Sequence, residues 1–181
     1  ITMNNGWRGD GTETKTINFN ASTITMNNGS WNFGYPSLPT NTTFNAGTST
    51  INIKPTASAF YGGGLTYNNV VFTAPNVGLT QPIYHSNTFK SLTFTGVGAG
   101  YIVIFKFYAN QTISNSGTVT ASSTSATSRI FLCSDTIGTA RTIAFGTSCT
   151  LSAPDCDFRD ITITGTPTGT TPTRAGNCGG N

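Results

Sequence analysis

The chain has 181 residues, of which 36% are hydrophobic and only 8% are charged, and its formal net charge is +3. The nine Lys and Arg residues are spread singly, whereas a nucleic-acid-binding surface would gather them on one face, so nucleic-acid binding is not expected. No apolar run is long enough to cross a bilayer, so membrane insertion is not expected either.

The first elements of the chain repeat each other. Residues 1–6, Ile-Thr-Met-Asn-Asn-Gly, recur intact as residues 24–29, a step of 23 along the chain. One coil of a parallel β-helix has about this length, and identical segments one period apart would stack directly on each other. Thr, Val, Ile and Phe favour strands, and no window shows a helical period. Residues 1–181 are therefore predicted to form a single all-β domain, a single-stranded right-handed parallel β-helix with coils of about 23 residues.

The same period continues in the middle and at the end of the chain. A pattern of aromatic-x-x-aliphatic-x-apolar-Thr begins at Tyr67, at Phe89 and at Phe158, and the last of these lies three periods after Phe89. Residues 101–107 alternate between inward and outward types, as a strand requires. Residues 100–150 follow the period less well. We interpret this as small register shifts at turns within coils.

Several segments together resemble a known class of solenoid. They are Thr43-Phe44-Asn45-Ala46-Gly47, Gly62-Gly63-Gly64-Leu65-Thr66-Tyr67-Asn68-Asn69, residues 111–120, Arg129-Ile130-Phe131-Leu132-Cys133-Ser134, residues 138–143 and Asp157-Phe158-Arg159-Asp160-Ile161. These segments resemble the right-handed parallel β-helix modules of very large bacterial surface proteins and of phage tail or fibre proteins. The resemblance covers about residues 40–181. It implies an extracellular scaffold and carries over no catalytic residue.

This fold favours a non-catalytic structural or adhesive function, as in a surface filament, an adhesin or a phage fibre. Its coils would display loops toward glycans or partner subunits. Solenoid ends normally carry caps, and neither end of this chain offers an amphipathic helix or a charged cap. We therefore expect a segment of a longer chain or a stacked filament subunit, contacting other subunits or flanking domains through its ends. The expected location is extracellular: the cell surface, a secreted filament or a virion.

Aromatic residues are the candidates for carbohydrate binding. Trp7 and Trp31 each follow an Asn-Asn-Gly sequence and are expected on adjacent coils, and Tyr35, Tyr61 and Tyr84 could extend the surface they form. Exposed aromatic rings with a polar tip suit sugar rings. The alternative is that both Trp side chains pack inside the N-terminal coils.

Acidic residues gather near the C-terminus, where Asp155, Asp157 and Asp160 lie within six positions. Their oxygens could bind a structural Ca²⁺, although no cofactor is otherwise expected. On a strand, Asp155 and Asp157 would point to one face about 7 Å apart, near the separation that an inverting glycosidase needs. A polysaccharide-degrading lyase or glycosidase is therefore the alternative function. The third interpretation is that these residues only cap turns.

Four cysteines, Cys133, Cys149, Cys156 and Cys178, occupy the last third of the chain. An even number in a charge-poor, Thr-rich chain suits an oxidising, extracellular compartment. Because Cys133 and Cys156 are one period apart, strict register would stack them within disulfide range and leave Cys149 to pair with Cys178. A bond between Cys149 and Cys156 is the alternative. A zinc site is not expected, since the single histidine, His85, is far away in sequence.

Two further features concern the surface. N-glycosylation sequons occur at Asn20, Asn28, Asn41 and Asn110. Threading the chain at the same period also predicts outward rows of Thr, including Thr50, Thr73, Thr95 and Thr118, which would resemble a Thr-array ice-binding protein. Arg141 falls in the same row and would spoil a flat face, so ice binding is the less favoured alternative. His85 has no partner triad in view and is interpreted as structural.

Overall fold

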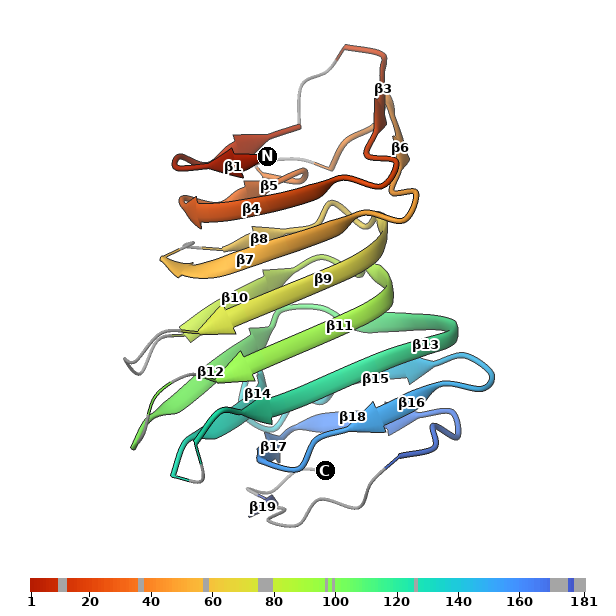
Figure 1. Cartoon of the computed structure of the whole chain (residues 1–181). Helices are drawn as coiled ribbons and strands as arrows, with labels where there is room; N and C mark the ends of the chain where they lie inside the picture. Colours follow the sequence, from red (N-terminus) through yellow and green to blue (C-terminus); the bar gives the residue numbers. More distant parts are fainter. Residues whose placement is uncertain are drawn as a thin grey trace.

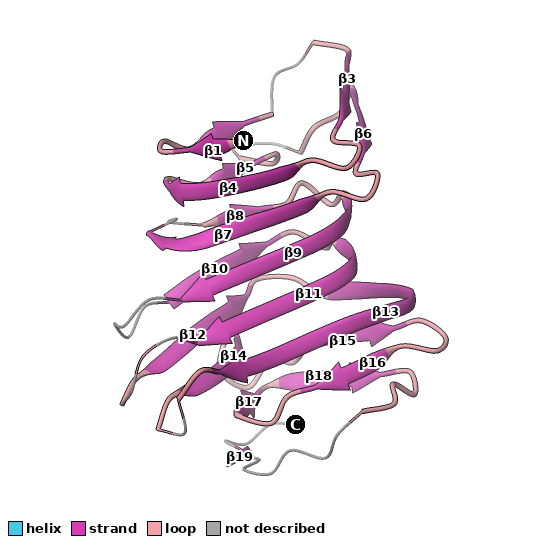
Figure 2. Ribbon diagram, in the orientation of Figure 1, coloured by secondary structure: helices cyan, strands magenta, loops and turns pink. Residues whose placement is uncertain are grey.

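The computed structural model is a stack of parallel strands in which two broad sheets face each other (Figure 1). It describes residues 1–9, 13–35, 38–56, 59–74, 80–96, 98, 100–125, 127–169 and 176–177. These ranges contain strands, turns and loops and no helix (Figure 2). The chain is therefore an all-β parallel solenoid, which confirms the fold class predicted from the repeat.

The strands fall into three sheets. The first sheet runs in the order β1 (Thr2–Met3), β4 (Thr23–Asn28), β7 (Thr50–Thr56), β9 (Thr66–Ala74), β11 (Thr88–Gly96), β13 (Gln111–Ser123), β15 (Arg141–Phe145) and β18 (Ile161–Thr164), with β16 (Thr150–Ser152) beside β13. The second sheet contains β2 (Trp7–Arg8), β5 (Trp31–Asn32), β8 (Phe60–Tyr61), β10 (Thr80–Tyr84), β12 (Ile102–Phe107), β14 (Arg129–Ser134), β17 (Cys156–Arg159) and β19 (Gly176–Asn177). A side sheet of two strands, β3 (Lys15–Asn18) and β6 (Thr42–Asn45), adds a third face to the N-terminal coils.

Alternating side chains from the two broad sheets fill the space between them. In β12 the inward residues Val103, Phe105 and Phe107 are buried, because successive side chains of a strand point to opposite faces. Phe94 of β11 packs against Phe105 with ring centroids 4.6 Å apart and against Phe72 of the neighbouring coil at 5.6 Å. Each coil thus buries its apolar side chains against the opposite sheet and against its neighbours.

Coil length varies along the stack, although it is roughly consistent with the predicted period. Thr2 pairs with Thr25, a step of 23, and β9 pairs with β11 at a step of 22, as in Tyr67 with Phe89. Other coils differ: Thr23 pairs with Thr50, a step of 27, and Thr50 pairs with Asn69, a step of 19. Loops at the corners take up the difference, so the strands stay in register.

A bulge in β13 explains why residues 100–150 follow the period poorly. The pairing of β11 with β13 shifts between Phe89 and Ser91, so that Phe89 lies beside Ile113 and Ser91 beside Thr118. Ser116 adopts a φ of 54°, in the left-handed region, and the chain loops out there before rejoining the sheet. A register shift is present as predicted, but it lies inside strand β13 and not at a turn, and the parallel stack continues through this region.

The third copy of the sequence pattern does not repeat the first two. Phe158 belongs to β17 of the second sheet and pairs with Leu132, whereas Ile161 belongs to β18 of the first sheet and pairs with Arg141. Asp160 lies between them with a φ of 53° and is buried. The chain therefore turns a corner inside the third copy of the pattern, which spans both broad sheets.

Candidate functional site

The two Trp residues stack on each other inside the N-terminal coils. Trp7 and Trp31 occupy paired positions of β2 and β5, and their ring centroids are 4.7 Å apart. Trp31 is 0% exposed, and its indole N–H donates a 3.2 Å hydrogen bond to the hydroxyl of Tyr67. The prediction that Trp31 presents its ring to a sugar is therefore wrong, because inward alternation places it in the core. Trp7 is partly buried and packs on Phe33 at 4.3 Å.

Four tyrosines form a ladder on the outer surface of the second sheet, one on each of four successive coils. We call Tyr35, Tyr61, Tyr84 and Tyr108 the tyrosine ladder. The ring centroids of Tyr35 and Tyr61 are 5.2 Å apart, those of Tyr61 and Tyr84 are 4.5 Å apart, and those of Tyr84 and Tyr108 are 4.2 Å apart. Tyr61 pairs with Tyr84 in the register of β8 and β10, so the ladder follows from the stacking of the coils.

Stacking determines which parts of these rings a ligand can reach. Tyr61 and Tyr84 are almost parallel, with an interplanar angle of 10°, so each ring covers a face of the other. The ends of the row are more open: Tyr35 is 57% exposed and Tyr108 is 37% exposed. The ladder therefore offers ring edges and hydroxyls along its length and ring faces at its two ends.

The phenol group of Tyr84 stays protonated over a wide pH range. Partial burial, together with hydrogen bonding to Tyr108 and Tyr61, raises the pKa of Tyr84 from 10.0 to about 12. A protonated phenol both donates and accepts hydrogen bonds. Tyr84 can therefore bond neutral polar groups such as sugar hydroxyls.

Sequence reasoning named Tyr35, Tyr61 and Tyr84 but missed Tyr108. The signal was present, since the steps from Tyr61 to Tyr84 and from Tyr84 to Tyr108 are each close to one coil. Tyr108 directly follows β12, whose Phe107 pairs with Ile83, and this places Tyr108 beside Tyr84. A search for one residue type at the coil period would have added Tyr108 to Tyr61 and Tyr84.

His85 lies next to the ladder and shapes the corner between β10 and β11. Its Nδ1 accepts a hydrogen bond of 3.1 Å from the backbone N–H of Gly63, and its ring centroid is 6.2 Å from that of Tyr61. Burial lowers the pKa of His85 below its usual value of 6.5. The neutral ring is thus part of the backbone hydrogen bonding of the corner, in agreement with the structural interpretation of this residue.

The three C-terminal aspartates do not form a shared site. Asp157 accepts hydrogen bonds from both Nε and Nη2 of Arg129, the Nε bond being 3.0 Å long. Asp160 accepts a 3.0 Å bond from the backbone N–H of Gly138 and lies 3.4 Å from Nε of Arg159. Asp155 lies in the turn before β17, where its carbonyl accepts from Ile130. Within the described ranges no three His, Cys, Asp or Glu residues gather as a metal site, so the predicted calcium cluster is not formed.

The described cysteines are buried free thiols. Cys133, Cys149 and Cys156 form no disulfide, so the predicted bond between Cys133 and Cys156 is wrong, as is the alternative between Cys149 and Cys156. The reason is the coil length: Cys133 pairs with Arg159, and Cys156 pairs with Ile130. Burial raises the pKa of Cys133 and of Cys156, so both thiols are protonated at neutral pH. Cys178 lies outside the described residues.

The four sequon asparagines are all exposed. They are Asn20, Asn28, Asn41 and Asn110. The predicted Thr rows are less regular than threading at a constant period suggests, because Thr50 pairs with Asn69 and Thr118 with Ser91. Thr73 does pair with Thr95. The outer face of the first sheet thus mixes Thr, Ser, Asn and Val.

Comparison with known proteins finds no matching family model, no matching curated protein and no matching solved structure. The resemblance to bacterial surface and phage fibre modules therefore stays a prediction. Among the described residues there is also no helix that is long and apolar enough to span a membrane.

Proposed function

We propose that this chain is a non-catalytic, extracellular structural and adhesive β-solenoid whose tyrosine ladder contacts glycans. The observation that carries the proposal is the ladder itself: four tyrosines in a row on the outside of the stack, ending in Tyr35 and Tyr108. Large aromatic side chains are usually buried, and a contiguous exposed set is typical of an interaction surface.

The ladder has the chemistry that a glycan needs. A sugar ring has apolar C–H faces and polar hydroxyl edges, and a tyrosine combines an apolar ring with a polar hydroxyl. The exposed rings of Tyr35 and Tyr108 suit stacking against sugar faces, and the hydroxyls of Tyr61 and Tyr84 suit hydrogen bonds along a polysaccharide chain. Repetition at every coil gives several weak contacts that act together.

The interactions of the C-terminal aspartates are consistent with a scaffold function. Asp157 and Asp160 are engaged by Arg129, Arg159 and backbone N–H groups, which holds their carboxylates in structural interactions. A glycoside hydrolase needs one carboxyl group that is free to give up a proton and a second that acts as base or nucleophile. The exposed sequons fit an extracellular surface. Partner subunits or flanking domains would contact the terminal coils, where β1 has β4 as its one sheet neighbour among the described strands.

Binding to immobilised polysaccharides of varied composition tests this proposal. Tyr61→Ala and Tyr84→Ala are each expected to weaken binding by about tenfold or more, as for a buried aromatic contact in an interface. Tyr84→Phe keeps the stack and removes one hydroxyl, so it should weaken binding less. Thr93→Ala, on the outer face of the first sheet, is the matched control and should leave binding unchanged.

Two results would contradict the proposal. One is binding to a polysaccharide that survives both alanine variants. The other is the release of new reducing ends from a polysaccharide by the wild-type chain, lost on Asp155→Asn or Asp157→Asn, which would favour the polysaccharide-degrading alternative.

A further inference from the structure

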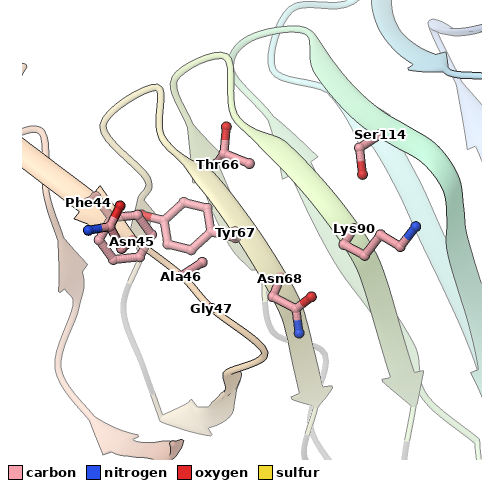
Figure 3. Close-up of a pocket in the computed structure, with 9 residues that line it drawn as sticks. All are labelled: Phe44, Asn45, Ala46, Gly47, Thr66, Tyr67, Asn68, Lys90 and Ser114. Atoms are coloured by element: carbon pink, nitrogen blue, oxygen red, sulfur yellow. The ribbon is translucent and has the colours of Figure 1, made fainter. Parts of the chain in front are cut away.

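A groove of about 420 Å³ lies beside the side sheet of the solenoid (Figure 3). Phe44 and the residues after it form one end, Tyr67 and Asn68 of β9 form the middle, and Lys90 and Ser114 form the other end. The rings of Phe44 and Tyr67 lie 5.1 Å apart at this first end and make it apolar.

The groove exists because the third face of the solenoid stops at β6. The N-terminal coils include β3 and β6, which pair in parallel. In the next two coils, short corners connect β8 directly to β9 and β10 directly to β11, with no strand between them. Among the described strands, β6 therefore has β3 as its one neighbour.

The side of β6 that faces away from β3 carries backbone groups that pair with no other described strand. The carbonyls of Asn41 and Asn45 accept hydrogen bonds of 2.9 Å from Lys15 and Phe19. Because alternate residues of a parallel strand face opposite neighbours, Thr42 and Phe44 direct their N–H and C=O groups away from β3. The hydroxyl of Thr42 is buried and has no hydrogen-bond partner among the described residues. An edge of this kind is a template for another strand.

Side chains at the edge of β6 indicate which residue types an added strand would have. Ile17 of β3 pairs with Phe44, and the amide of Asn45 donates a 2.7 Å bond to the side chain of Asn18. An added strand with the same order, an apolar residue followed by Asn, would continue both the apolar stack and the Asn stack. Lys90 is the one charged residue among the described residues that line the groove, and its ammonium donates to the carbonyl of Asn115 at 2.7 Å. Two of its N–H donors remain for an anion.

We propose that β6 is a docking site for an extended peptide segment of a partner protein. The segment adds to β6 as a third parallel strand and continues the ladder of the side sheet. It places an apolar residue beneath Phe44, an Asn beneath Asn45 and, further along, a carboxylate beside Lys90. This is strand addition at a sheet edge, in which backbone bonds give affinity and side-chain positions give specificity.

A synthetic peptide tests the proposal. The probe copies residues 41–46 of this chain and ends in an added aspartate, and its binding is followed by fluorescence anisotropy. Thr42→Pro removes an outward N–H and is therefore expected to abolish binding. The variant should still fold, because Pro is tolerated at the start of an edge strand. Lys90→Met should weaken binding about three- to fivefold, which is the scale of a partly exposed ion pair. Lys106→Met, on β12 of the second sheet, should bind as the wild type does.

Hydrogen exchange keeps the test decisive if Thr42→Pro fails to fold. On the wild-type chain, the peptide should slow exchange of the Phe44 amide, whereas a peptide of the same composition in scrambled order should not. The proposal is overturned if the peptide fails to bind the folded chain at millimolar concentration, or if it binds folded Thr42→Pro equally well. It is also overturned if β6 pairs with a second copy of the chain, seen as a concentration-dependent dimer that Thr42→Pro abolishes.

Discussion

The side to which a single aromatic residue points decides its role in this solenoid. Trp31 and Tyr61 lie in neighbouring strands of the second sheet, and the strand pairing puts Trp31 beside Phe60 and Asn32 beside Tyr61. Trp31 therefore joins the core, while Tyr61 joins the outer ladder. A shift of one residue in either strand would exchange these roles, because the side-chain period of a strand is two. The exposed chemistry of the chain thus depends on correct register at each coil.

His85 gives a prediction at the residue scale. Its pKa is lowered in the folded chain, so the unfolded chain binds more protons as the pH falls below the unperturbed value of 6.5. The free energy of unfolding should therefore be highest above pH 6.5 and should decrease as the pH falls from there. His85→Asn tolerates the positive φ of 67° and removes the titrating ring, so its stability should depend less on pH over this interval.

Urea unfolding between about pH 5 and pH 8 measures this difference, since histidine is the side chain whose unperturbed charge change falls in that range. Equal slopes of stability against pH for the wild type and His85→Asn would contradict the assigned role of the Gly63 to His85 hydrogen bond.

At the scale of single elements, the bulge of β13 is the feature that disturbs the period most. Ser114 to Gly117 leave the ladder so that β13 can pair with β11 on both sides of the loop. Gly117 sits at the tightest point: a Cβ there would lie 2.6 Å from the carbonyl oxygen of Ser114 and 2.7 Å from that of Lys90. Backbone atoms cannot move away at low energetic cost, so only glycine fits at position 117.

Gly117→Ala is therefore expected to reduce the free energy of unfolding by about 1–3 kcal/mol, the usual cost of forcing an extra carbon into a packed site. Gly96→Ala is the matched control, because its new Cβ would first meet the side-chain hydroxyl of Ser128 at 3.2 Å and should cost less. Denaturant unfolding of both variants provides the measurement. Equal stability losses would show that the bulge is not tightly packed.

The same scale shows where sequence reasoning works. Strands that keep alternating apolar residues through one sheet, such as β9, β11 and β12, are found where the pattern predicts them. The pattern fails at Asp160, since a buried aspartate in the left-handed region turns the chain from one sheet to the other. Side-chain periodicity does not distinguish a straight strand from one that bends at a corner.

Across the whole molecule, the average period predicts the fold but not the neighbours of each residue. Steps between residues paired in the named strands range from 19, as in Thr50 with Asn69, to 32, as in Gln111 with Ile143. Corner loops of different length produce this spread, and their lengths carry no hydrophobic signal. The disulfide prediction failed for this reason, because a step of 26 places Ile130, not Cys133, beside Cys156.

The candidate site could be predicted only in part from the sequence. Tyr35, Tyr61 and Tyr84 were named as aromatics that could extend a sugar-binding surface, but their stacking in one row with Tyr108 was not predicted. The groove beneath β6 could not be predicted, since it depends on a strand that the later coils lack among the described residues. A groove that forms because a strand is not continued in the next coil has no sequence motif of its own.

The central claim is that parallel coils align Tyr61, Tyr84 and Tyr108 in one continuous row on the outer surface of the second sheet. Nuclear Overhauser contacts between the ring protons of selectively labelled tyrosines test it most directly. The ring spacings of 4.5 Å and 4.2 Å predict strong cross-peaks from Tyr84 to both Tyr61 and Tyr108, with Tyr84→Phe used for assignment. Cross-peaks to neither neighbour in the folded chain would contradict the register of the second sheet, and with it the proposed contact surface.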